Sequence, residues 1–348
     1  MNCSRARRQR QRTGALPRLC LCALTIATLV FSTTLVSRAA VVSEDFATDP
    51  TARGWRAFGD SSLFHWNAAN QNLEVTWDSS HTNSFYYLPL GTVLARNDDF
   101  SVSFDVRLSD IHIGTTPGKT NTFELAIGLI DYRSAIRSNA FRGAGLSSTY
   151  GVRNVVEFDY FMDPTDGDTF TTAVISSNNS FAYFDNFPLT MSVGDLYRIE
   201  MDYSASNRVL RTSAHKNGSP FGTLGDVLLP AGFDFRVDSF AVTSYSDAVQ
   251  APPAAYNGSV LAHGVVDNVE LKLPPPPLGS VALRQTNSSY VADFASSTNW
   301  LYTLEGSGEL GRWAARSAAT RGNGATLSVA DTNPVAEKVF YRVRAERP

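Results

Sequence analysis

Cysteine is nearly missing from this chain of 348 residues, and its three copies, Cys3, Cys20 and Cys22, all stand close to the start. The chain beyond them therefore has no disulfide and no thiolate metal site. Its fold must be held by a hydrophobic core, which the remaining length is large enough to bury. A basic excess is also missing: beyond residue 39, 23 basic residues stand against 33 acidic ones. This balance argues against nucleic acid and anionic lipid as partners.

Long apolar runs are scarce as well. The one extended run, residues 19–36, follows six arginines and precedes Ser37-Arg38-Ala39. A basic head, an apolar middle and small residues before a cut site are typical of a secretory signal peptide. We therefore predict that residues 1–39 are removed and that the protein is secreted, periplasmic or at the cell surface, with no membrane contact beyond this leader. An uncleaved anchor helix is the alternative, because the run is nearly long enough to span a bilayer.

Helical periodicity is the third absence. Apolar residues nowhere keep the i, i+3, i+4 spacing for three turns, so long helices are not expected. Residues 100–108 and 196–203 instead alternate apolar and polar side chains, and residues 123–130 form a more continuous apolar strand. Many short strands separated by turn residues predict an all-β sandwich or barrel.

Four consecutive prolines divide the chain. Residues 274–278 are predicted to form a stiff linker, because proline lacks the amide donor that a sheet requires. Residues 40–273 have the size of one large sandwich, and residues 279–348 are predicted to be a small separate β-sandwich module. We also expect residues 43–46 and 266–270 to pair, which would close the large domain with its ends together.

Acidic residues cluster in one stretch, residues 154–168. Its first half alternates like a strand, which places Glu157 and Asp159 side by side on one face. Its second half is a turn-rich loop that contains Asp163 and Asp168. Clustered carboxylates repel one another unless a cation or solvent screens them. The stretch is therefore either a ligand site or a solvated acidic turn.

Around Glu157 the sequence resembles the concanavalin A-like lectin and glucanase superfamily. Legume-type lectins carry Glu-Phe-Asp on a strand, followed by metal ligands at fixed offsets that this chain meets without a gap. The resemblance implies that residues 40–273 form a two-sheet antiparallel jelly-roll sandwich. It also implies a calcium site, since calcium prefers carboxylate and carbonyl oxygens. The implied metal ligands are Glu157, Asp159, Phe161 through its backbone carbonyl, Asp163 and Asp168.

The chain departs from the family pattern in three places. The family's transition-metal site needs a histidine where this chain has Ala173, so no manganese is expected. At Asp163 the family usually has asparagine, whose amide donates to the sugar, and a carboxylate cannot make that bond. The glucanase pattern Glu-x-Asp-x-(x)-Glu lacks its third acid, because Phe161 or Met162 stands there. Retaining hydrolysis needs two carboxyl groups about 5–5.5 Å apart, so we expect no glycosidase activity of this kind.

Aromatic side chains are the second feature that suggests carbohydrate, because sugar rings stack their C–H faces on them. Trp66 is followed by a polar segment, and Tyr86 lies in the same aromatic-rich part of the chain. We predict that Trp66, Tyr86 and Asp163 contact a ligand. The alternative for each aromatic residue is a place in the core, where most large aromatic side chains of a sandwich belong.

These observations together predict an exported, non-catalytic, lectin-like protein that binds a polysaccharide or surface glycan, with calcium as its cofactor. One alternative is an extracellular structural or adhesion protein that uses the sandwich as a scaffold. A glucanase-like glycoside hydrolase comes third. The C-terminal module resembles the β-rich tails of secreted bacterial proteins, which implies a role in docking, spacing or sorting.

Overall fold

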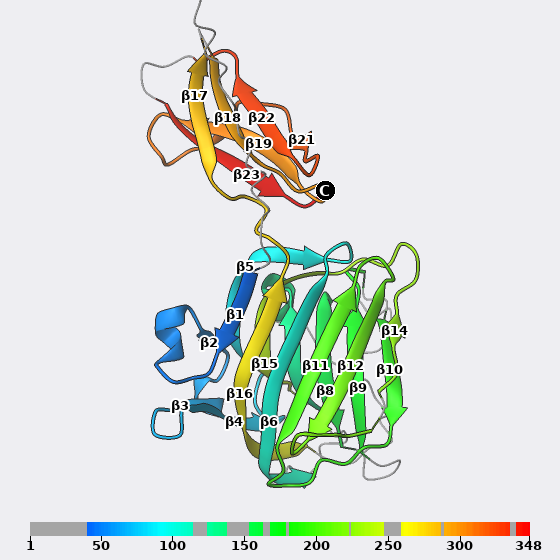
Figure 1. The fold of residues 1–348 in the computed structure, drawn as a ribbon. Coiled ribbons are helices and arrows are strands. Elements are labelled where there is room, and N and C mark those ends of the chain that lie inside the picture. The colour runs from blue at the N-terminus through cyan, green and yellow to red at the C-terminus, as the bar shows by residue number, and fades with distance from the viewer. Residues whose placement is uncertain are drawn as a thin grey trace, which may run out of the picture. The chain divides into compact units, whose positions relative to one another are not determined.

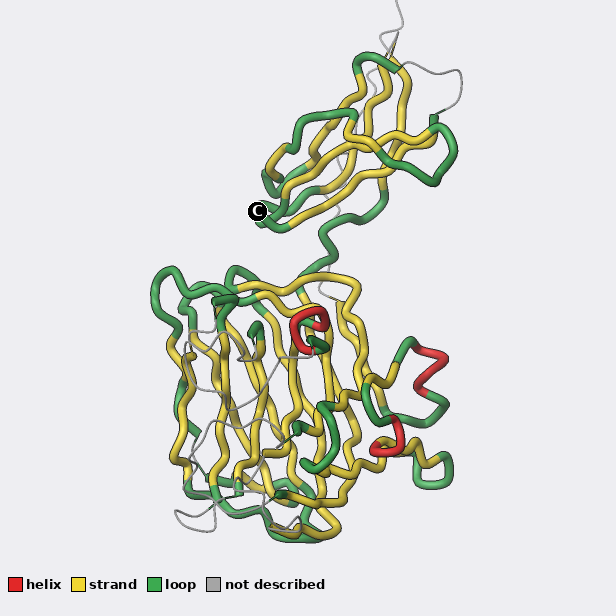
Figure 2. Tube along the Cα trace, turned by 180° about the vertical axis from the view of Figure 1, so that it is seen from behind, coloured by secondary structure: helices red, strands yellow, loops and turns green. Residues whose placement is uncertain are grey.

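The computed structural model describes residues 40–113, 124–137, 153–162, 168–178, 181–222, 224–246, 259–286, 289–334 and 339–348. Nearly all of their regular structure is β (Figure 1). Among the described residues, helical segments are limited to three short pieces, drawn red in Figure 2: η1 (Pro50–Arg53), η2 (Ser61–Leu63) and α1 (Tyr132–Ala135). In the described part of the chain, no helix has the length and apolar character needed to cross a membrane.

Residues 40–273 build two antiparallel sheets. The larger has nine strands: β13 (Ser219–Pro220), β12 (Val209–Lys216), β11 (Tyr197–Ser204), β6 (Phe100–Ile113), β16 (Val260–Leu273), β4 (Asn72–Asp78) and β3 (Phe64–Asn67) in that order, with β1 (Ala40–Glu44) beside β16 and β14 (Val227–Leu228) beside β12. The second has seven strands, in the order β10 (Phe181–Phe187), β9 (Thr169–Ile175), β8 (Val155–Phe161), β7 (Glu124–Ile130), β15 (Arg236–Ser244), β5 (Ser84–Ala95) and β2 (Arg56–Phe58).

The core lies between these sheets and follows from strand alternation. On β6 every second side chain from Phe100 to Leu108 is buried, as the sequence predicts. Phe104 of β6 meets Phe158 of β8 across the core, with their ring centroids 6.0 Å apart. The all-β sandwich prediction is thereby confirmed, because two sheets each bury one face against the other.

The two ends of the large domain pair with each other. Strand β1 runs antiparallel to β16, with Ser43 opposite Glu270 and Glu44 opposite Val269. The pairing expected from the sequence is therefore confirmed. Strand β16 ends at Leu273, directly before the four prolines, whose missing amide donors would break the ladder.

Residues 281–346 form two further small sheets. One contains β17 (Val281–Thr286), β18 (Ser289–Ala295) and β22 (Thr326–Asp331), and the other contains β20 (Ala314–Ala315), β19 (Leu301–Ser307), β21 (Thr320–Arg321) and β23 (Phe340–Glu346). They enclose a core of their own, in which Phe294 and Tyr302 have ring centroids 4.9 Å apart. We call residues 279–348 the C-terminal module.

Candidate functional site

The seven-stranded sheet has a second apolar layer on the face that points away from the main core. Most of its buried members share strands with core residues but alternate with them, whereas Ala135 lies in α1 and Tyr245 follows β15. The members are Phe85, Tyr87, Ala126, Ile130, Ala135, Val155, Ile175, Ala241 and Tyr245. We call this the outer face of the sheet. Glu157 and Asp159 lie on it, because they alternate with the core residues Phe158 and Tyr160 along β8.

Both carboxylates of the outer face are closed to solvent, with exposed fractions of 1% for Glu157 and 0% for Asp159. Their cross-strand neighbours are small: Gly128 and Ala173 flank Glu157, and Ala126 lies beside Asp159. At Gly128 a Cβ would stand 2.5 Å from the Cα of Glu157, so only glycine lets the two strands approach this closely.

Glu157 has a partner from a distant part of the chain. The Tyr245 hydroxyl donates to its Oε2 over 2.9 Å, 88 residues away in sequence. A buried carboxylate needs such donors, because burial without them costs free energy. The sequence thus correctly places Glu157 and Asp159 side by side, and the structure shows that this pair is buried.

The remaining predicted metal ligands lie in different surroundings. Asp168 accepts a hydrogen bond of 2.7 Å from the hydroxyl of Tyr160, whose ring belongs to the main core on the opposite face of β8. Burial raises the pKa of Tyr160, and the bond to Asp168 raises it further. Phe161 is the last residue of β8 and is half-buried. Asp163 lies outside the described residues.

The described acids do not form a calcium cage by themselves. Within the part of the chain that the structure describes, no three histidine, cysteine or acidic side chains are placed to hold a metal ion. The reason is that Asp168 bonds to Tyr160, whose side chain alternates with Glu157 and Asp159 along β8 and so lies on the opposite face of the sheet. Calcium binding by the predicted set stays a prediction.

The two aromatic residues predicted to bind ligand pack against the main core. The Trp66 indole donates from Nε1 to the carbonyl of Phe46 over 2.8 Å. Tyr86 is buried and stacks on Trp55 and on Phe64, at centroid distances of 5.2 and 5.7 Å. Burial raises the pKa of Tyr86 to about 12. Ligand contact by Trp66, Tyr86 and Asp163 stays a prediction.

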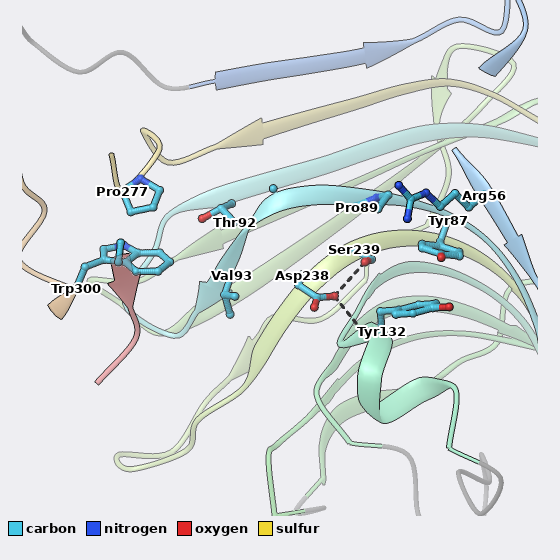
Figure 3. A pocket seen from close by; sticks show the side chains of 12 residues that line it. Arg56, Tyr87, Pro89, Thr92, Val93, Tyr132, Asp238, Ser239, Pro277 and Trp300 are labelled. Carbon is cyan, nitrogen blue, oxygen red and sulfur yellow. Dashed lines mark hydrogen bonds between the residues drawn. The ribbon is translucent and has the colours of Figure 1, made fainter. Parts of the chain in front are cut away.

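A groove that sequence reasoning missed lies on the outer face (Figure 3). Its volume is about 420 Å³, and its lining includes Tyr87, Tyr132 and Trp300 together with Arg56 and Asp238. The rings of Tyr87 and Tyr132 stack at 4.4 Å with an interplanar angle of 24°. The signal for Tyr87 was present in the sequence, because alternation sends one of the adjacent tyrosines 86 and 87 to the core and the other to the outer face.

Tyr132 is held in place by its backbone. It opens helix α1, where Asp131 caps the helix by accepting from the Ser134 amide over 2.7 Å. The Asp238 carboxylate accepts from the Tyr132 amide and from the Ser239 hydroxyl, each over 2.9 Å, as the dashed lines in Figure 3 show. A hydrogen bond with Tyr87, aided by burial, raises the pKa of Tyr132 to about 12. The Tyr132 side chain is therefore neutral at ordinary pH.

The groove combines aromatic surface with a few polar groups. Such linings are typical of small-molecule sites, where the apolar surface supplies affinity and the polar groups fix orientation. Arg56 offers guanidinium donors and Asp238 offers acceptor oxygens. Among the described lining residues, Asp238 is the single carboxylate, and its Oδ1 already accepts two hydrogen bonds.

Neither a protein-family model nor a curated protein matches the chain. Solved structures do match it. Peanut lectin with a nine-residue peptide is 15% identical, with a TM-score of 0.44, and covers 69% of this chain and 100% of its own. Lectin II from Ulex europaeus is 14% identical, with a TM-score of 0.42, over 67% of this chain and 98% of its own. The alginate lyase Aly36B is 11% identical, with a TM-score of 0.37, over 67% of this chain and 96% of its own.

The matched structures include legume lectins. A legume lectin-like domain from Entamoeba histolytica is also among them, 9% identical with a TM-score of 0.38 over 66% of this chain and 95% of its own. Lectins of this kind belong to the concanavalin A-like superfamily that the sequence around Glu157 resembles. With identities and TM-scores this low, the likeness says nothing about ligand or activity.

Proposed function

We propose that the chain is an exported, non-catalytic carbohydrate-binding protein and that the groove over Tyr87 and Tyr132 takes the sugar. The observation that carries this proposal is the stacked tyrosine pair, set beside Arg56 and Asp238 in one open groove. A pyranose ring has an apolar C–H face and a rim of hydroxyl groups. An aromatic surface with neighbouring donors and acceptors complements both parts of such a ring.

The fixed position of Tyr132 supports binding by a preformed surface. Its amide is bonded to Asp238, its helix is capped by Asp131, and its ring is stacked on Tyr87. A side chain that is already ordered loses little conformational entropy when a ligand covers it. Tyr132 is also only half-buried, so part of its ring remains available to a ligand.

The buried acids support binding rather than hydrolysis. Glu157 and Asp159 occupy the first two positions of the glucanase-like pattern, but both are closed to solvent and neither lines the groove. A hydrolase acid must lie within hydrogen-bond reach of the bond it cleaves. A sugar seated on Tyr132 is therefore expected to remain intact.

The test is calorimetric titration of the full chain with a panel of disaccharides and hexasaccharides of the cello, laminari, xylo, manno, chito and uronate series. We expect at least one series to bind, and Tyr132→Ala to weaken it about ten-fold or more, which corresponds to about 1.4 kcal/mol. The matched control is Tyr290→Ala. Tyr290 is also a half-buried tyrosine that packs against another tyrosine, Tyr341, at a centroid distance of 5.2 Å with the rings tilted by 36°, but it lies on β18 outside the groove lining.

Each alternative function has a distinct outcome in the same experiment. If no member of the panel binds, the proposal is wrong and the scaffold alternative is favoured. Release of reducing ends from the hexasaccharides would instead show an enzyme. Titrations repeated with a chelator test the calcium prediction, because affinity should fall only if a metal ion shapes the site.

A further inference from the structure

A buried arginine joins the C-terminal module to the large sandwich. Arg347 follows β23, and its Nε and Nη2 donate to the carbonyl of Val93 on β5 over 3.0 and 2.7 Å. Nη2 also forms an ion pair with Asp98. The exposed fractions of the two side chains are only 6% for Arg347 and 5% for Asp98. A charge pair buried this deeply is stabilised by its hydrogen bonds as well as by Coulomb attraction.

The guanidinium of Arg347 also contacts Trp300, which lines the groove. Its carbon lies 4.1 Å from the ring centroid of Trp300, the distance of a cation–π contact, and its Nη1 donates to the carbonyl of Asn299 over 3.4 Å. The Val93 side chain packs against the small core of the module that contains Trp300. Arg347 is thus placed between Trp300 and strand β5.

The groove is lined from both parts of the chain. Tyr87 and Tyr132 come from the sandwich, whereas Pro277, Trp300 and Ala345 come from the linker and the C-terminal module. In Figure 3, Pro277 and Trp300 lie at one end of the groove, and Tyr87 and Tyr132 lie at the other, with Thr92 and Val93 between them. A short sugar on the tyrosines need not reach Trp300, but a longer chain along the groove would.

We propose that the C-terminal module is one wall of the carbohydrate groove and that Arg347 is the positioning residue that holds this wall in place. This inference rests on the proposed function of the groove. It gives the module a part in recognition: the sandwich binds the first sugar units, and the module adds contacts to the units that follow. The expected ligand is therefore an oligosaccharide or polysaccharide chain rather than a single terminal sugar.

Removal of either partner of the buried pair should displace the wall, because the remaining charge would stay buried without its counter-ion. Two full-chain variants test this from opposite sides. Arg347→Met keeps the apolar stem and deletes the charge. Asp98→Asn keeps an acceptor for the Ala95 amide, which Asp98 Oδ2 now binds over 2.9 Å. The matched control is Arg284→Met, which breaks the more exposed pair with Asp293 inside the same module.

The readout is the affinity for each disaccharide and its matching hexasaccharide from the panel above. We expect both variants to weaken hexasaccharide binding about ten-fold or more and to leave disaccharide binding unchanged. Arg284→Met should change neither. A purely structural role of Arg347 would weaken both lengths alike, so an equal loss overturns the inference. If Arg347→Met does not fold, Asp98→Asn gives the same comparison.

Failure of the inference is distinguishable from failure of the proposed function. Unchanged hexasaccharide affinity in both variants, with binding still lost in Tyr132→Ala, refutes the wall and leaves the tyrosine site standing. Absence of binding by the wild-type chain refutes both. Limited proteolysis provides a second readout, since a released module should expose the chain on either side of the four prolines to cleavage.

Discussion

The buried carboxylate of Glu44 should be among the most sensitive positions for the stability of the sandwich. It closes β1 and accepts from the Phe46 amide over 2.6 Å, from Arg53 Nε over 2.7 Å and from Trp55 Nε1 over 2.9 Å. Arg53 Nη2 forms an ion pair with Oε1, the oxygen that also accepts from the Phe46 amide. Every partner is a donor, so the site fits a carboxylate, which only accepts.

We expect Glu44→Gln to lower the free energy of unfolding by about 2–4 kcal/mol. The substitution turns one acceptor into an amide that faces donors, and it leaves Arg53 without its counter-charge. Removal of one partner from a fully buried pair costs about 3–5 kcal/mol. The value here is lower because the Arg53 side chain is 35% exposed and can regain water. The melting temperature should fall by about 4–16 °C.

Urea unfolding followed by tryptophan fluorescence would measure this change, since Trp55 belongs to the network. The matched control is Glu270→Gln, which removes an exposed pair between Glu270 Oε1 and Lys272 Nζ, 3.3 Å apart, on the neighbouring strand. This control should cost less than about 1 kcal/mol. A loss at Glu44 no larger than the loss at Glu270 would refute the reasoning.

Two further predictions concern groups buried elsewhere. Tyr245→Phe should cost about 1–3 kcal/mol in urea unfolding because it deprives the buried Glu157 of a donor. This loss of unfolding free energy should exceed the loss caused by Tyr203→Phe, because the Tyr203 hydroxyl donates to a neutral backbone carbonyl. Equal losses would contradict this prediction. Burial raises the pKa of Asp98 above its usual 3.8, so between pH 3.8 and this raised pKa the native state keeps a proton that the unfolded state has released. The unfolding free energy, measured against Asp98→Asn, should therefore fall as pH rises from 3.8 through the raised pKa, and a constant difference would contradict this.

The alternation of apolar and polar residues predicted most of the sandwich from the sequence. Alternation identified the buried face of β6 and placed Glu157 and Asp159 together on β8, because both properties depend on neighbours in sequence. It could not say which of two alternating faces meets the main core. That ambiguity matters at two adjacent tyrosines, because Tyr86 is a core residue whereas Tyr87 lines the groove.

The parts of the site that the sequence did not reveal depend on long-range contacts. The Tyr132 amide meets Asp238 across 106 residues, and Arg347 meets Val93 across 254. No local sequence pattern predicts such a long-range contact, because only the folded sheets bring the residues together. The position of Asp168 could not be predicted from the sequence either. Its separation from Glu157 in sequence fits a metal loop, but it bonds to the hydroxyl of Tyr160, whose side chain lies on the other face of β8.

The pairing of β1 with β16 has a consequence for how this domain can be combined with others. Ala40 and Leu273, the first and last residues of the two strands, stand directly opposite each other. A domain whose ends meet in this way can be spliced into a surface loop of a host protein through two short joints, without stretching either chain. A circular permutant of this domain, in which Ala40 and Leu273 are joined and new termini are opened in a distant turn, should also fold.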